Sequence, residues 1–240
     1  MSTEPTDPVD PEPVDPKTSR QPRSPQDKQQ AKEIAANGQT LDAVITDAGT
    51  PGPIADALAE GGYALPELQR GQGLQVAAQS SLSAHLAASG AKDAGTKAYL
   101  SAEKAFLAVY TTLRGLARTA FLKNTAALTT LGVSGTQPRD MLSLINAANA
   151  LLDNASQPEY ADKLNRRAVT AAKLQNLRTR LDALKAADQV QEDSKGAASK
   201  ATVQRDQSAA ALKAWMTEFK AFAKIQFKDQ PDILKSWGLK

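Results

Sequence analysis

The segment Leu113–Val133, LRGLARTAFLKNTAALTTLGV, has a counterpart near the end of the chain, Phe219–Leu239, FKAFAKIQFKDQPDILKSWGL. The two segments align without a gap at a spacing of 106 residues. They share the order of side-chain types, which runs aromatic or aliphatic, basic, small and aliphatic, and both end in glycine followed by an aliphatic residue. A repeat of this length predicts a duplicated helical unit.

Apolar residues in both copies recur every three or four positions, the spacing of a helix that buries one face. These residues are Phe106, Val109, Leu113 and Leu116 in the first copy, and Leu212, Trp215, Phe219 and Phe222 in the second. Aromatic stripes of this kind predict a core. A third run, Leu164–Leu184, alternates alanine with leucine and predicts a closely packed partner helix. Because no stretch alternates β-branched residues as a strand would, the expected fold class is all-α, with two tandem antiparallel helical bundles related by internal duplication.

Prolines and glycines divide the chain into segments, because proline lacks the amide hydrogen that a helix interior needs. They predict a disordered arm over residues 1–24 and two helical bundle units over residues 25–135 and 136–240. Ser24 is the expected N-cap of the first helix, with Pro25 at its first position. The predicted helices cover residues 25–48, 54–60, 66–89, 92–123, 138–153, 158–188, 192–228 and 231–237, with a further short helix before Gly132.

A second correspondence joins ELQR at residues 67–70 to KLNR at residues 163–166, a spacing of 96 residues. The difference from the first spacing predicts about ten additional residues in the second hairpin. We expect them in the polar stretch 188–201, which contains Gly196. Hairpin tips tolerate insertions, so this tip is either a product of sequence drift or a partner-binding element.

The first 25 residues hold seven of the 13 prolines and mainly polar neighbours. Such a composition predicts an extended arm that cannot bury enough surface to fold. Acidic residues up to Asp15 precede Lys17, Arg20 and Arg23. The arm could therefore also dock on a basic surface of a neighbouring copy.

The composition excludes several kinds of chemistry. The chain of 240 residues has no cysteine and one histidine, so disulfides, thiolate metal sites and histidine-rich zinc sites cannot form. Neither a phosphate-binding loop nor a nucleophile–histidine–acid spacing is present. We therefore expect no enzyme activity, no catalytic residue, no cofactor and no metal. With neither a signal-like N-terminus nor a membrane-length apolar stretch, the expected location is cytoplasmic.

Basic residues gather on one predicted helix, opposite its leucine face, and form a candidate basic surface: Lys163, Arg166, Arg167, Lys173, Arg178, Arg180 and Lys185. Three interpretations are open. The face is solvated, it pairs with acidic groups within an assembly, or it binds nucleic acid or another anionic polymer through phosphate contacts.

The endings Phe121–Val133 and Phe227–Leu239 resemble the close of each repeat in uncharacterised bacterial proteins built from tandem, alanine-rich helical bundles. The resemblance covers most of the chain after about residue 29 and implies a tandem helical fold of bacterial type. It implies no activity.

The leading functional hypothesis is a non-enzymatic interaction or structural scaffold protein that binds a protein partner or associates with itself. An exposed apolar patch around Trp215, Phe222 or Trp237 would favour this hypothesis. One alternative is binding of an apolar small ligand between helices, which requires an enclosed pocket. The other alternative is nucleic-acid binding through the basic helix.

Overall fold

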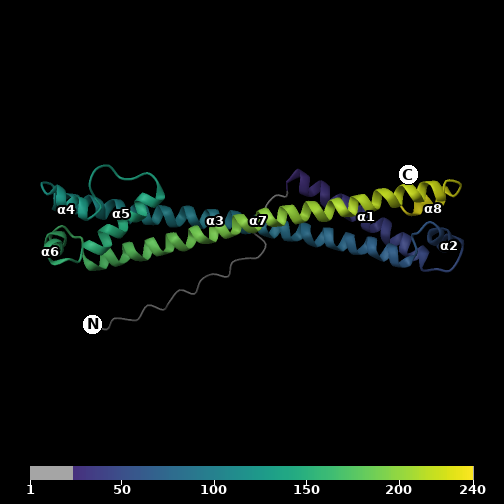
Figure 1. Ribbon diagram of the computed structural model, residues 1–240, viewed down its shortest axis with the longest axis horizontal. Helices are drawn as coiled ribbons and strands as arrows, with labels where there is room; N and C mark the ends of the chain where they lie inside the picture. The colour runs from purple at the N-terminus through teal and green to yellow at the C-terminus, as the bar shows by residue number, and fades with distance from the viewer. Residues whose placement is uncertain (1–23, 240) are drawn as a thin grey trace, which may run out of the picture. The chain divides into compact units, whose positions relative to one another are not determined.

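The computed structural model describes residues 24–239, and these residues form α-helices without any strand (Figure 1). The helices are α1 (Pro25–Ala48), α2 (Pro53–Glu60), α3 (Leu65–Ala120), α4 (Thr125–Thr130), α5 (Met141–Asn154), α6 (Pro158–Arg166), α7 (Ala171–Gln226) and α8 (Pro231–Ser236). The all-α prediction is confirmed. So is the N-cap, because the Ser24 hydroxyl accepts a hydrogen bond from the amide of Asp27 at 3.1 Å. The rest of the predicted arm lies outside the described residues.

Three predicted helix boundaries are wrong. The helix α3 continues through Gly90, and α7 continues through Gly196 and the whole stretch 188–201, where a hairpin tip was expected. A glycine inside a helix costs only about 1 kcal/mol relative to alanine, which flanking residues and packing can offset. The predicted helix 158–188 instead breaks after Arg166, where Ala168 adopts a left-handed conformation with φ of 60°.

Helix boundaries repeat along the chain at a constant spacing. The long helices α3 and α7 both contain 56 residues, and they begin and end 106 positions apart. The short helices α4 and α8 show the same spacing. Leu58 and Leu164, also 106 positions apart, are both buried. The spacing of 96 residues and the insertion near residues 188–201 are therefore wrong, because no residues are added between these elements.

The ends of the short helices repeat with the same backbone geometry. After α4, Gly132 has φ of 66° and the amide of Val133 donates to the carbonyl of Leu128 at 2.9 Å. After α8, Gly238 has φ of 70° and the amide of Leu239 donates to the carbonyl of Leu234 at 2.7 Å. Both are Schellman endings, in which a left-handed residue lets the chain turn back onto the helix end.

The helices α2 and α6 also end alike. The amide of Tyr63 donates to the carbonyl of Leu58 at 2.8 Å, and the amide of Val169 donates to the carbonyl of Leu164 at 2.9 Å. The left-handed position is Gly62 in one case and Ala168 in the other. The alanine keeps the turn although the left-handed region costs an L-residue about 1 kcal/mol.

The chain divides into two compact units. Unit 1 joins residues up to 79 with residues from 212 onward, and unit 2 consists of residues 80–211. The predicted boundary between residues 135 and 136 therefore lies inside unit 2. Each unit contains part of α3 and part of α7.

Unit 1 buries an aromatic cluster between its helices, and α1 runs beside the first part of α3 and the last part of α7 (Figure 1). The rings of Trp215 and Phe219 stack at 5.5 Å between centroids, and Tyr63 packs edge-on against both at 5.8 and 5.2 Å. Trp237, which follows α8, packs edge-on against Phe227 at 5.0 Å. These contacts hold the C-terminal end of the chain in the core of unit 1.

Both indole groups of unit 1 are anchored by carboxylates. The Nε1 of Trp215 donates to Glu67 Oε1 at 2.7 Å, and the Nε1 of Trp237 donates to Asp47 Oδ2 at 2.6 Å. A Cβ atom at Gly71 would lie 2.5 Å from the Trp215 ring, so this position of α3 needs glycine for close approach. The helices of unit 1 are close-packed at this point.

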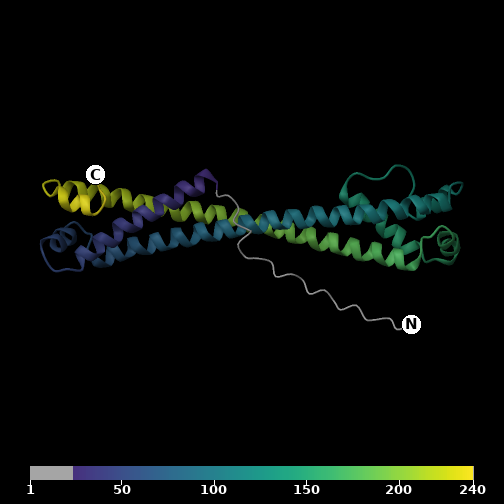
Figure 2. The same cartoon turned by 180° about the vertical axis from the view of Figure 1, so that it is seen from behind.

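Unit 2 has a separate core of aliphatic and aromatic side chains from all its helices, with α5 lying against the last part of α3 and the first part of α7 (Figure 2). Phe106 and Tyr110 stack at 5.7 Å, and Phe121 packs edge-on against Tyr160 at 5.6 Å. The apolar stripes predicted from the repeat thus contribute to the cores of both units.

Candidate interaction surface

The structure distributes the candidate basic residues over two helices and the turn between them. Lys163 and Arg166 belong to α6 and Arg167 lies in the turn, whereas the others lie on α7, namely Lys173, Arg178, Arg180 and Lys185. The prediction that they share one helix is wrong, because the helix breaks at residues 167–170. All seven side chains are exposed.

Four of these residues gather where α6 turns into α7, and we name them the basic corner: Lys163, Arg166, Arg167 and Lys173. The buried residues Tyr160 and Leu164 attach α6 to the core, which leaves the charged residues outside. The Nζ of Lys163 lies 5.6 Å from the centroid of the Phe121 ring. Within residues 24–239, none of the four forms an ion pair, whereas Arg178 pairs with Asp153 at 3.6 Å.

The corresponding turn of unit 1, between α2 and α3, carries the opposite charge. Its charged residues, which we name the acidic corner, are Asp56, Glu60 and Glu67. Over the matched stretches, residues 52–67 have three acidic and no basic residues, and residues 158–173 have four basic and two acidic residues. Formal charge is therefore −3 at one turn and +2 at the other, on the same backbone geometry.

The formal charges of the whole units differ in the same way as those of the two turns. The described part of unit 1 has eight basic and ten acidic residues, and unit 2 has 17 basic and 11 acidic residues. The formal charges are −2 and +6. The basic excess of the chain is thus confined to unit 2.

The three candidate apolar contact residues lie in unit 1 and are mostly enclosed. Trp215 and Trp237 are 5% and 1% exposed, so neither tryptophan forms the exposed patch that the scaffold hypothesis anticipated. Phe222 is half-buried and stacks on Tyr63 at 4.8 Å. All three residues pack in the aromatic cluster of unit 1.

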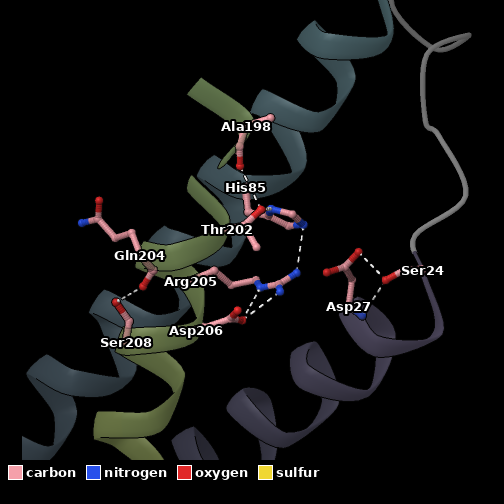
Figure 3. A network of polar contacts seen from close by, with 9 residues as sticks. All are labelled: Ser24, Asp27, His85, Ala198, Thr202, Gln204, Arg205, Asp206 and Ser208. Carbon is pink, nitrogen blue, oxygen red and sulfur yellow. Dashed lines mark hydrogen bonds and ion pairs between the residues drawn. The ribbon is translucent and has the colours of Figure 1, made fainter. Parts of the chain in front are cut away.

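Sequence reasoning missed a polar cluster around the single histidine of the chain (Figure 3). His85 of α3 lies between two residues of α7, with Arg205 Nη1 at 2.9 Å from its Nε2 and Thr202 Oγ1 at 3.3 Å from its Nδ1. A guanidinium only donates hydrogen bonds, so Nε2 of His85 is the acceptor in this contact. Arg205 also donates to the carboxylate of Asp206 at 2.8 Å.

This cluster connects two helices of unit 2 by hydrogen bonds between side chains more than one hundred positions apart. No spacing rule links such positions, so the sequence carries no signal for it. In the same view, the Ser24 hydroxyl and the Asp27 carboxylate lie 2.7 Å apart at the start of α1. The cluster has a structural role, because it links α3 to α7.

Two arginines of α3 hold the loop that follows α4. Arg114 Nη2 donates to the carbonyl of Gly135 at 2.6 Å, and Arg118 Nη1 donates to the carbonyls of Val133, at 3.1 Å, and Gly135. At the spacing of 106 residues, the counterparts of these arginines are Lys220 and Lys224. Charge-assisted bonds to carbonyls explain why arginine, with its several donors, occupies these positions.

Tyr110, one helical turn before Arg114, has a fully buried hydroxyl that makes no well-aligned hydrogen bond among the described residues. Burial raises the pKa of Tyr110 above its usual value of 10.0, and the charge of the Arg114 guanidinium partly opposes this shift. The folded state therefore binds the phenolic proton more tightly than the unfolded chain does. The contribution of Tyr110 to stability is therefore fully present below pH 10.0 and is lost as the pH rises through its raised pKa.

Replacing Tyr110 by phenylalanine should leave stability at neutral pH unchanged or raise it by about 1 kcal/mol, because a buried hydroxyl without a well-aligned hydrogen bond is removed. Above pH 10.0 the variant should lose less stability than the parent chain. Urea unfolding curves of the variant and the parent chain, measured at neutral pH and above pH 10.0, check this. An identical alkaline loss in the two proteins would contradict it.

Within residues 24–239, no group of three or more histidine, aspartate or glutamate side chains is placed to hold a metal ion. None of the described helices combines the length and apolarity that crossing a membrane requires. Comparison with protein-family models, with curated proteins and with solved structures finds no match for this chain. The resemblance to bacterial tandem-bundle proteins therefore stays a prediction.

Proposed function

We propose that the chain is a duplication of a helical unit and that it works as a non-enzymatic scaffold that associates with further copies of itself. The carrying observation is that the two turns, α2–α3 and α6–α7, keep the same backbone hydrogen bonds while the net formal charges of residues 52–67 and 158–173 have opposite sign. Charges that the fold does not need are free to serve recognition.

The helix boundaries support the duplication. The repeat 25–135 supplies α1, α2, α3 and α4, and the repeat 136–240 supplies α5, α6, α7 and α8. Each repeat contributes helices to both compact units, because α3 and α7 each pass from one unit into the other. The two repeats are then joined by their long helices rather than standing as separate bundles.

The use of polar side chains supports a scaffold rather than an enzyme. The buried or half-buried polar groups at Glu67, Asp47 and His85 are bonded to other helices of their own unit. Glu67 and Asp47 each hold an indole, and His85 lies between Thr202 and Arg205. These groups stabilise the packing of the helices. The exposed charged groups are therefore the ones that can contact a partner.

Light scattering coupled to size exclusion tests self-association. We expect the average mass to rise above the monomer mass of 25.4 kDa as concentration increases. The series should run from about 1 μM to 1 mM, because contacts made mainly by exposed charges are weak. A constant mass of 25.4 kDa throughout would overturn the proposed function.

A further inference from the structure

We infer that the contact between copies joins the basic corner of one copy to the acidic corner of another. This inference rests on the proposed function and names the surfaces that would carry it. In this contact, the basic corner of one copy faces the acidic corner of the next. The basic residues are Lys163, Arg166, Arg167 and Lys173, and the acidic residues are Asp56, Glu60 and Glu67.

Apart from Glu67, which holds the Trp215 indole, the charged residues of the two corners are not used by the fold. Leu58 and Leu164 occupy equivalent buried positions, and each helix ends with the same pattern of amide donors. Against this constant background, Glu60 stands where unit 2 has Arg166, and Glu67 stands where unit 2 has Lys173. The same backbone therefore accepts either sign of charge at these two pairs of positions.

Six of the seven charged residues at the two corners are available to a partner. Asp56, Glu60 and all four residues of the basic corner are exposed. Among the described residues, neither Asp56 nor Glu60 is in an ion pair, and the basic corner has none either. Glu67 is half-buried and is held by Trp215 and by Arg70 at 2.8 Å, so it contributes charge but is already bonded.

A second copy of the chain fits the basic corner because the complementary surface is present on the same molecule. The formal charges of unit 1 and unit 2 are −2 and +6, so unit 1 of one copy attracts unit 2 of another, whereas like units repel each other. A contact between two different surfaces is heterologous, so the same contact can be repeated from copy to copy. Exposed charge pairs are screened by salt, so association should weaken as ionic strength rises.

Two charge-reversal variants test the pairing. The first carries Arg166→Glu, Arg167→Glu and Lys173→Glu, so both of its corners are acidic. The second carries Asp56→Lys and Glu60→Lys, so both of its corners are basic; Glu67 is kept because it anchors Trp215. Each variant alone should associate at least about tenfold more weakly than the parent chain. An equimolar mixture of the two should recover association.

The matched control carries Lys97→Glu, Lys104→Glu and Lys200→Glu, which change net charge equally at exposed positions outside the corner. It should associate like the parent chain. Circular dichroism and thermal unfolding confirm that all the variants are folded. If the control weakens association as much as the first variant does, the effect is one of net charge and the inference is overturned.

The remaining outcomes separate the two proposals. A parent chain that stays monomeric overturns the proposed function itself. Association that persists in both variants overturns only the assignment of the corners. A monomeric parent chain that binds duplex DNA in a salt-dependent manner, with the binding lost in the first variant, would assign the basic corner to a polyanion instead.

Discussion

Replacing Trp237 by alanine is expected to lower the free energy of unfolding by about 3–5 kcal/mol, the usual cost of removing a large aromatic side chain from a core. The ring is 1% exposed and lies against Phe227 and Phe219. Its loss would also leave the Asp47 carboxylate without the indole donor. The last residues of the chain are thus part of the core of unit 1.

Denaturant unfolding monitored by circular dichroism measures this effect. The control is Lys235→Ala in α8, an exposed position two residues earlier, where a change within about 0.5 kcal/mol is expected. A loss below about 1 kcal/mol for Trp237→Ala would mean that the C-terminal turn does not stabilise unit 1.

Replacing Gly132 by alanine is expected to destabilise the protein by about 2–4 kcal/mol, from two separate causes. The residue has φ of 66°, which alanine adopts only at a cost. An added Cβ would also lie 2.8 Å from the carbonyl oxygen of Ala147 and from the Cβ of Ala150. The backbone oxygen belongs to α5 and cannot move without shifting that helix.

The equivalent substitution Gly238→Ala provides a matched control. This glycine has φ of 70°, but the nearest atom to its added Cβ is Thr40 Oγ1 at 4.0 Å. Only the conformational cost of about 1 kcal/mol is then expected. Gly132→Ala should therefore lower the free energy of unfolding by about 1–3 kcal/mol more than Gly238→Ala does. Equal losses would show that α5 does not pack against Gly132 as closely as described.

Several features were predictable because they depend on short-range rules. The spacing of Phe106 and Phe219 in their stripes predicts helices with one buried face, and both residues are buried. The glycine–aliphatic endings at residues 132 and 238 predict helix ends, and both are Schellman turns. The N-cap Ser24 follows from the preference of serine for an orphan backbone amide.

Other features were missed because they depend on contacts between distant residues. Breaks were predicted at Gly90 and between residues 188 and 192, but both places lie inside continuous helices of 56 residues. The carboxylates that anchor the indoles lie 148 and 190 positions from them. The candidate basic residues were recognised from sequence, but their division at the α6–α7 turn was not. The structure shows that four of them surround the α6–α7 turn, and that the equivalent α2–α3 turn carries acidic residues.

The sequence alone determined the helical class, the side-chain pattern that recurs after 106 residues and the buried faces of the two apolar stripes, because these follow from periodicity and side-chain chemistry within a few turns. Tertiary structure decided which helices continue and which residues form a unit. Residues 212–239 belong with residues up to 79, whereas residues 80–211 form a unit of their own. Such groupings depend on packing energy between segments far apart in the chain, for which local patterns carry no information.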